Sequence, residues 1–209
     1  MTSSSPRDRL IEAGLKLFYR DGFHATGIEA ILAEAGVAKK TLYSHFGSKE
    51  DLIIAVMQRR DDNYRAWFTN EVERRGRTPA ERLLACFEVI EEWTRSKDFY
   101  GCACINATAE FADPRDPVHK VAAGNKVFVA SYLRDLAREA GLRNPERISH
   151  QLLVLIDGAV VVAQVTGKMH IVADAKKAAG LLVAEAKPDP LVRRRTARTR
   201  PHSLPKSLL

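Results

Sequence analysis

Apolar residues recur every three or four positions along almost the whole chain, which is the period of an amphipathic α-helix. The first such stretch begins at Pro6 and ends at Asp21-Gly22, where the glycine stands just past a helix end. The sequence lacks the alternating runs bounded by turn pairs that indicate strands. The pattern therefore predicts an all-α fold.

Turn residues divide this pattern into about nine helices. Short helices are expected from Thr26 and from about Ala38, and Ser48 opens a longer one. Glu29 stands three residues after Thr26, as in a capping box, so we expect Thr26 to cap the second helix. The remaining helices are expected near residues 79–97, 101–112, 118–140, 144–167 and 172–186.

The helices suggest two folded units and a tail. We place the first unit at 1–48, a second helical unit at 49–186, and a basic tail at 187–209. The tail holds four prolines and seven Lys/Arg against one Asp, which accounts for most of the net charge of +7. This composition is typical of disorder. Two interpretations stay open: a solvated tail without a role, and an arm that binds phosphates non-specifically.

Composition and motifs exclude several classes of protein. The apolar runs 152–156 and 159–163 are separated at Asp157 and fall short of the roughly 20 residues of a membrane span. The N-terminus lacks the apolar core of a secretory signal, so we expect a cytoplasmic protein without a membrane partner. The three cysteines have no zinc-site or disulfide-framework spacing, so no metal or other cofactor is expected. No catalytic motif is found, which argues against an enzyme.

Residues 22–52 carry the strongest local signal. Two short helices are joined by a tight Ala35-Gly36-Val37 turn, which is the layout of a helix-turn-helix. A helix that enters the major groove must present hydrogen-bond donors and small apolar groups on its outer face. That outer face is formed here by Lys39, Lys40, Thr41 and Tyr43.

This stretch resembles the DNA-binding domain of the TetR/AcrR family of bacterial regulators. The matching residues are Gly22-Phe23, Thr26, Ile31, Ala35-Gly36-Val37, Thr41-Leu42-Tyr43, His45-Phe46, Ser48-Lys49-Glu50 and Leu52. Two positions depart from the family pattern. Ala38 stands where a serine often caps the recognition helix, and Gly27 stands where threonine or serine is usual.

The resemblance also implies partners and residue roles. It implies a homodimer on a palindromic operator in double-stranded DNA, a repressor released by a small-molecule effector. It assigns base or nearby backbone contacts to Lys39, Lys40, Thr41 and Tyr43. It assigns phosphate contacts to Thr26, His45 and Lys49.

The second unit yields two sets of candidate residues. Helical spacing suggests an effector pocket lined by Phe87, Trp93, Asn106, Phe111, Phe128 and Tyr132, with Gln164 as a further polar contact. The helix near 144–167 is apolar nearly all round, which indicates burial on more than one side. With the last helix it is expected to form a four-helix dimer interface. The predicted interface residues are Leu152, Leu155, Ile156, Ala159, Val160, Ala163, Leu181 and Leu182.

Two alternatives to a ligand-responsive regulator remain. One is a dimeric interaction protein without specific DNA recognition, which would show no preference for one palindrome over competitor DNA. The other is a redox or electrophile sensor built on Cys102 and Cys104. Residues two apart on a helix point about 200° apart, so both thiols are not expected to face one pocket. With Lys97 the nearest cation in sequence, inert packing is the favoured interpretation of both cysteines.

Overall fold

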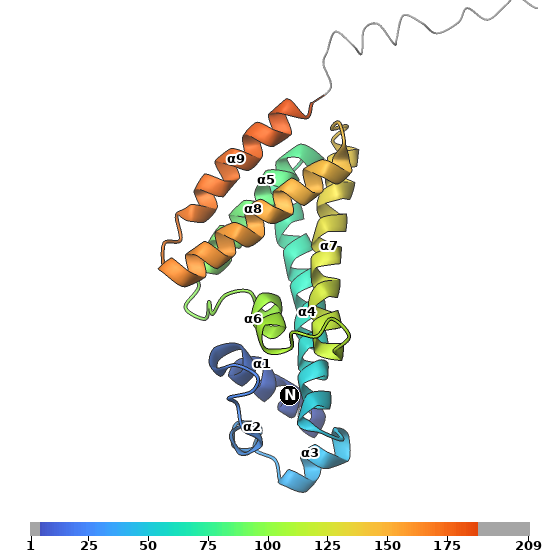
Figure 1. The fold of residues 1–209 in the computed structure, drawn as a ribbon, viewed down its shortest axis with the longest axis vertical. Coiled ribbons are helices and arrows are strands. Elements are labelled where there is room, and N and C mark those ends of the chain that lie inside the picture. The colour runs from blue at the N-terminus through green and yellow to red at the C-terminus, as the bar shows by residue number, and fades with distance from the viewer. Residues whose placement is uncertain (1–4, 188–209) are drawn as a thin grey trace, which may run out of the picture.

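The computed structural model describes residues 5–187, and this part of the chain is made of helices and the turns between them (Figure 1). Within the described range there are nine helices and no strand, which confirms the all-α prediction. The basic tail lies outside the described residues apart from Lys187, so its role stays a prediction.

Three short helices gather at one end of the molecule (Figure 1). Helix α1 (Pro6–Asp21) begins where the hydroxyl of Ser5 accepts a hydrogen bond from the N–H of Asp8 at 3.1 Å. Helices α2 (Ile28–Ala35) and α3 (Lys39–His45) follow. Gly36 joins them at φ +61°, in the left-handed region that only glycine enters without steric cost. The predicted helix-turn-helix is thus present.

Helix α4 (Lys49–Arg75) runs from this end into the rest of the fold. Its first half contributes Leu52 and Val56 to a core shared with α1 to α3, and its second half contributes Phe68 and Val72 to a separate core. Close packing of α1 on α4 depends on Gly14, because a Cβ there would lie 2.5 Å from a methyl of Val56. One continuous helix therefore links the two cores.

Five further helices follow: α5 (Pro79–Thr94), α6 (Ala103–Glu110), α7 (Pro117–Glu139), α8 (Pro145–Thr166) and α9 (Ile171–Glu185). Helices α5, α8 and α9 and most of α7 complete the second core, whereas Ala107 of α6 and Val118 and Ala122 at the start of α7 belong to the first core. Helix α6 lies between the α1–α3 end and the end formed by α5, α8 and α9 (Figure 1). It is shorter than the expected 101–112 because Cys102 is extended, at φ −78° and ψ 113°, and stands at its N-cap.

Helix α8 is long and apolar enough, by length and composition alone, to pass as a membrane span. The apolar runs on either side of Asp157, which were expected to fall short of a membrane span even together, thus lie in one helix of sufficient length. The core helix of a soluble protein passes the same test, and α8 packs against α5, α7 and α9. On the side of α8 that these helices leave open, Val154, Val162 and Val165 remain exposed.

Candidate DNA-binding face and effector cavity

Helix α3 is anchored by one side and leaves the other open. Leu42 is fully buried against α1 and α2, whereas Lys40 and His45 are exposed and Tyr43 has an exposed fraction of 50%. Thr41 is half-buried. The open side carries an amine, a phenol and an imidazole. These groups can donate hydrogen bonds to base edges and to phosphates.

Two further amines lie at the surface near α3, and both have protein partners. Nζ of Lys39 donates to Oε1 of Glu29 at 3.0 Å, and this hydrogen bond raises the pKa of Lys39. Nζ of Lys49, at the start of α4, donates to the carbonyl oxygen of His24 at 3.3 Å. A phosphate would have to compete with Glu29 for Lys39, whereas Lys49 has only a neutral acceptor to give up.

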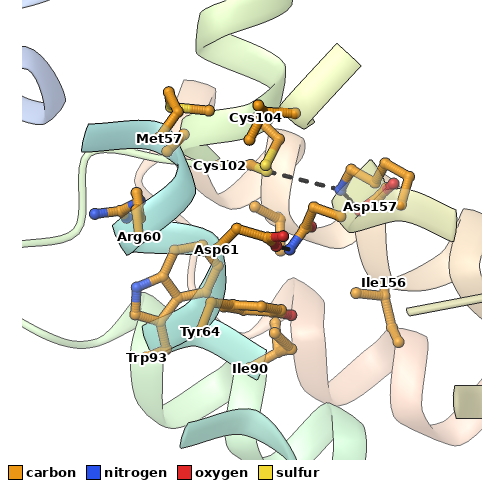
Figure 2. A pocket seen from close by; sticks show the side chains of 15 residues that line it. Met57, Arg60, Asp61, Tyr64, Ile90, Trp93, Cys102, Cys104, Ile156 and Asp157 are labelled. Carbon is orange, nitrogen blue, oxygen red and sulfur yellow. Dashed lines mark hydrogen bonds and ion pairs between the residues drawn. The ribbon is translucent and has the colours of Figure 1, made fainter. Parts of the chain in front are cut away.

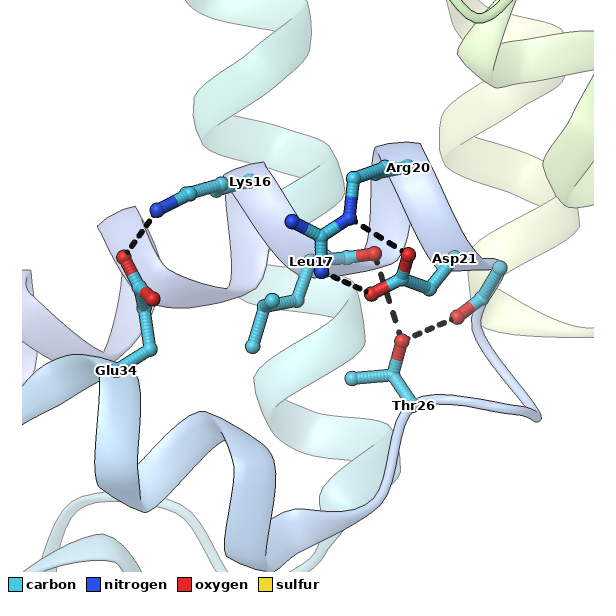
Figure 3. Close-up of polar contacts among 7 residues, drawn as sticks. Lys16, Leu17, Arg20, Asp21, Thr26 and Glu34 are labelled. Atoms are coloured by element: carbon cyan, nitrogen blue, oxygen red, sulfur yellow. Dashed lines mark hydrogen bonds and ion pairs between the residues drawn. The ribbon is translucent and has the colours of Figure 1, made fainter.

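The side chain of Thr26 contacts the end of α1 instead of capping α2 (Figure 3). Its exposed fraction is 4%, and its hydroxyl donates to the carbonyl of Gly22 at 2.6 Å and lies 3.5 Å from that of Leu17. The N-cap of α2 is Gly27, which has no side-chain cap. Both predictions for the Thr26 side chain, helix cap and phosphate contact, are therefore wrong. The turn folds back on α1, and the hydroxyl satisfies the carbonyl of Gly22, which follows the last residue of that helix.

Glu110, the last residue of α6, contacts the loop that leads from α1 into α2. Its carboxylate accepts hydrogen bonds from the N–H groups of Phe23 at 2.9 Å and His24 at 2.7 Å, and Nδ1 of His24 lies at 2.7 Å. Burial alone would raise the pKa of Glu110, but these contacts outweigh it and the pKa is lowered. The neighbouring Phe111 packs on Phe23 and His24 instead of lining a pocket, which corrects the prediction for it.

A small cavity lies among α4, α5, α6, α7 and α8 (Figure 2). Its volume is about 50 Å³, well below the roughly 300–1,000 Å³ of a pocket for a drug-sized ligand. In Figure 2 the two thiols lie on one side and the rings of Tyr64 and Trp93 on the other. The lining residues are Met57, Arg60, Asp61, Tyr64, Ile90, Trp93, Cys102, Ala103, Cys104, Val121, Asn125, Lys126, Ile156, Asp157 and Val160.

Of the six predicted pocket residues, only Trp93 lines this cavity. Phe87 is fully buried in the second core, and Phe128 and Tyr132 pack against that core. Asn106 hydrogen-bonds the carbonyl of Tyr100 and accepts from Gln164 outside the cavity. Helical spacing finds apolar faces but does not separate a face on a core from a face on a cavity.

The polar lining of the cavity was missed, although one signal was available. Asp157 interrupts an apolar helix, and its Oδ1 accepts a hydrogen bond from Nζ of Lys126 at 2.5 Å. Burial alone would lower the pKa of Lys126, but Cys102 and Asp157 outweigh it and the pKa is raised. On the opposite wall, Nδ2 of Asn125 donates to Oδ1 of Asp61 at 2.8 Å. A charged residue inside an otherwise apolar helix, here Asp157, was therefore the sequence signal that could have located the polar lining of this cavity.

Both cysteines face the same cavity, contrary to the helical-wheel argument. That argument fails because Cys102 precedes the first helical residue of α6, so the helical period does not apply to it. Its Sγ lies 3.7 Å from Nζ of Lys126, on α7. The cation beside Cys102 is therefore Lys126 and not Lys97, which is nearer in sequence.

The predicted dimer residues of α8 belong mostly to this chain's own core. The exposed fraction is at most 4% for Leu152, Ile156, Ala159, Val160 and Ala163. Leu155 and Leu182 are half-buried. The apolar residues left exposed on the two helices are instead Val154, Val162, Val165 and, from the original set, Leu181.

Comparison with known proteins adds independent observations. Residues 10–56 match the family profile described as bacterial regulatory proteins of the tetR family. The FasR transcriptional activator of Mycolicibacterium smegmatis is 46% identical over 57 residues, which cover 27% of this chain and 26% of FasR.

Solved structures match over much greater lengths. SCO4454, a TetR-family transcriptional regulator from Streptomyces coelicolor, is 28% identical with a TM-score of 0.81, and the match covers 88% of this chain and 96% of that one. The TetR-type regulator sav143 of Streptomyces avermitilis is 31% identical with a TM-score of 0.72. That match covers 84% of this chain and 98% of sav143. This chain therefore belongs to the TetR family of DNA-binding transcriptional regulators.

Proposed function

We propose that the chain is a cytoplasmic, homodimeric repressor that a small molecule releases from a palindromic operator. Residues 5–48 would bind DNA, and residues 49–186 would bind the effector and the second copy. The observation that carries this proposal is the exposed outer face of α3, held by a buried Leu42. DNA contacts are assigned to Lys39, Lys40, Thr41, Tyr43, His45 and Lys49.

The dimer is supported by the uncovered face of α8 and α9. Val154 and Val165 lie eleven positions apart, about three turns along one face, and their exposed fractions are 71% and 77%. Leu181 on α9 is 75% exposed. Exposed apolar side chains on two adjacent helices favour burial against a second copy. A two-fold axis there would pair two copies of α3 for a palindrome.

The proposed coupling between effector binding and DNA binding is supported by the helices that line the cavity. Arg60 and Tyr64 belong to α4, which starts beside the DNA-binding helices, and Cys104 belongs to α6, which ends at Glu110. An occupant larger than the cavity must displace one of these helices. It would then bind the displaced state better than this one, which is the differential affinity that release from DNA requires.

Repression is the simplest direction of control for such a dimer. A protein that occupies a promoter blocks polymerase with no further contact, whereas activation needs a second surface that recruits polymerase. FasR is named an activator, so the direction needs its own test: a reporter gene behind the selected operator, with and without the regulator.

The test of DNA recognition is selection of bound duplexes from a random pool, with the full chain and with residues 1–187. Recovery of one palindrome by both forms supports the proposal. Sequence-random recovery that disappears with the tail would assign DNA binding to non-specific phosphate contacts of the basic arm, and the proposal would fall.

A further inference from the structure

The two thiols of the cavity lie close to the ammonium of Lys126. Cys104, in the first turn of α6, and Cys102, at the N-cap of that helix, both line the cavity. Nζ of Lys126 lies 3.7 Å from Sγ of Cys102 and 2.5 Å from Oδ1 of Asp157. The ammonium is half-buried, and the atoms around it are the sulfur of Cys102 and the carboxylate of Asp157. The Lys126 ammonium favours a negative charge on Cys102, and the Asp157 carboxylate opposes it in part.

The third cysteine shows what an inert thiol looks like in the same fold. Cys86 is fully buried in the second core, and burial raises the pKa of its thiol. Cys102 is half-buried at a cavity wall, and the neighbouring Cys104 thiol together with the Lys126 ammonium 3.7 Å away lowers its pKa against the effect of burial. The thiolate is the nucleophilic form of cysteine, and of the two thiols that line the cavity Cys102 is the one with the Lys126 ammonium 3.7 Å from its sulfur.

We propose that Cys102 captures small α,β-unsaturated carbonyl compounds covalently, so that the effector of this regulator is an electrophile. The biological part of this inference rests on the proposed function, whereas the reaction itself does not. The apolar wall of Tyr64, Trp93 and Ile90 faces the thiols and would hold the carbon skeleton. The small cavity selects small reactants.

The reaction is an addition and needs no oxidant. The thiolate of Cys102 forms a carbon–sulfur bond to the β-carbon, and the π electrons of the C=C bond move onto the carbonyl oxygen to give an enolate. A proton from the Lys126 ammonium then reaches the α-carbon, and the neutral amine recovers a proton from water. The product is a stable thioether that occupies the space between α4 and α6.

The test treats the full-length protein with a limiting amount of methyl vinyl ketone at pH 7 and follows each cysteine by peptide mass spectrometry. We expect Cys102 to react at least about tenfold faster than Cys104, with Cys86 unmodified. Lys126→Met should slow the modification of Cys102 by about tenfold, and Lys126→Arg, which keeps the charge, by much less. Cys86 is the folding control, because its alkylation reports unfolding.

A Cys102 that reacts no faster than Cys104 or free glutathione would overturn the proposal. Equal rates in Lys126→Met and Lys126→Arg would do the same. If Lys126→Met exposes Cys86, the wild-type comparison among the three cysteines decides the matter by itself. Affinity for the selected operator is measured separately on the modified protein and on Cys102→Ser. A rapid adduct that leaves DNA binding unchanged would count against the proposed effector control, while the capture site would stand.

Discussion

The Glu110 carboxylate at the end of α6 holds the loop before α2 through His24, whose N–H donates to it and whose Nδ1 lies 2.7 Å away. The two residues are 86 positions apart in the chain. This contact joins the helix that lines the cavity to the helix-turn-helix. It is therefore a polar route by which a displaced α6 would move the DNA-binding helices.

Replacing Glu110 with Gln should loosen this connection. The amide keeps one acceptor but loses the charge, so we expect faster amide hydrogen exchange at Phe23 and His24 and a weaker effect of any effector on operator affinity. Glu73→Gln, at an exposed position of α4, is the matched control. Unchanged exchange in Glu110→Gln would show that the loop holds its position without the carboxylate.

The same contact has a defined pH dependence. The pKa of Glu110 is lowered from 4.5 in the folded protein, so its stabilising contribution is complete above pH 4.5 and is lost as the pH falls through the lowered value. Acid titration followed by the NMR signals of residues 22–27 should show local loosening below pH 4.5. In Glu110→Gln that component of the transition should disappear.

Substitutions on the outer face of α3 should separate DNA binding from dimerisation. Tyr43→Ala and Lys40→Ala should each weaken operator binding by about 1–3 kcal/mol, while sedimentation shows an unchanged dimer. If Lys40 contacts a phosphate, the salt dependence of binding should also fall by about one unit of slope. Lys177→Ala, an exposed lysine on α9, is the control. Equal affinity in all three variants would remove α3 from the interface.

A charge on the α8–α9 face should break the dimer without unfolding the chain. Val165→Glu and Leu181→Glu introduce carboxylates at positions that are exposed in the protomer, so folding should be retained while a desolvated charge opposes association. Val127→Glu is the matched control on α7, at an exposed fraction of 66%. Monomers in the first two variants and a dimer in the third would support the proposed interface; three dimers would contradict it.

Two tyrosines should respond in opposite ways to loss of the hydroxyl. The hydroxyl of Tyr132 is buried without a hydrogen-bond partner in the described part of the chain, and burial raises its pKa to about 12. Tyr132→Phe should therefore be neutral or stabilise the fold by about 1 kcal/mol.

Tyr19 is the contrasting case. Its hydroxyl donates to the carbonyl of Gly101 at 2.8 Å and accepts from the N–H of Tyr100 at 3.1 Å. Tyr19→Phe should cost about 1–3 kcal/mol, because it leaves both backbone groups without that partner. Denaturant unfolding of the two variants gives the comparison. A stability loss in Tyr132→Phe similar to that in Tyr19→Phe would show that Tyr132 has a partner.

The sequence by itself determined the all-α fold, the approximate positions of the helices and the helix-turn-helix. These follow from local chemistry: apolar period, caps such as Ser5 and Ser48, and Gly36 in a left-handed turn. The same local rules placed Lys40 and Tyr43 on the open side of α3, because Leu42 between them is its one buried residue.

Only the tertiary structure decided which side of each later helix faces the core, the cavity or the surface. Leu152 and Val165 are both apolar residues of α8, yet one is in the core and the other is exposed, because neighbouring helices cover only one side. Cys102 contacts Lys126, and Glu110 contacts His24, because the fold brings together segments that are distant in the chain. Periodicity reports that a helix has an apolar face, but its neighbours in space determine whether that face meets a core, a cavity or a second copy.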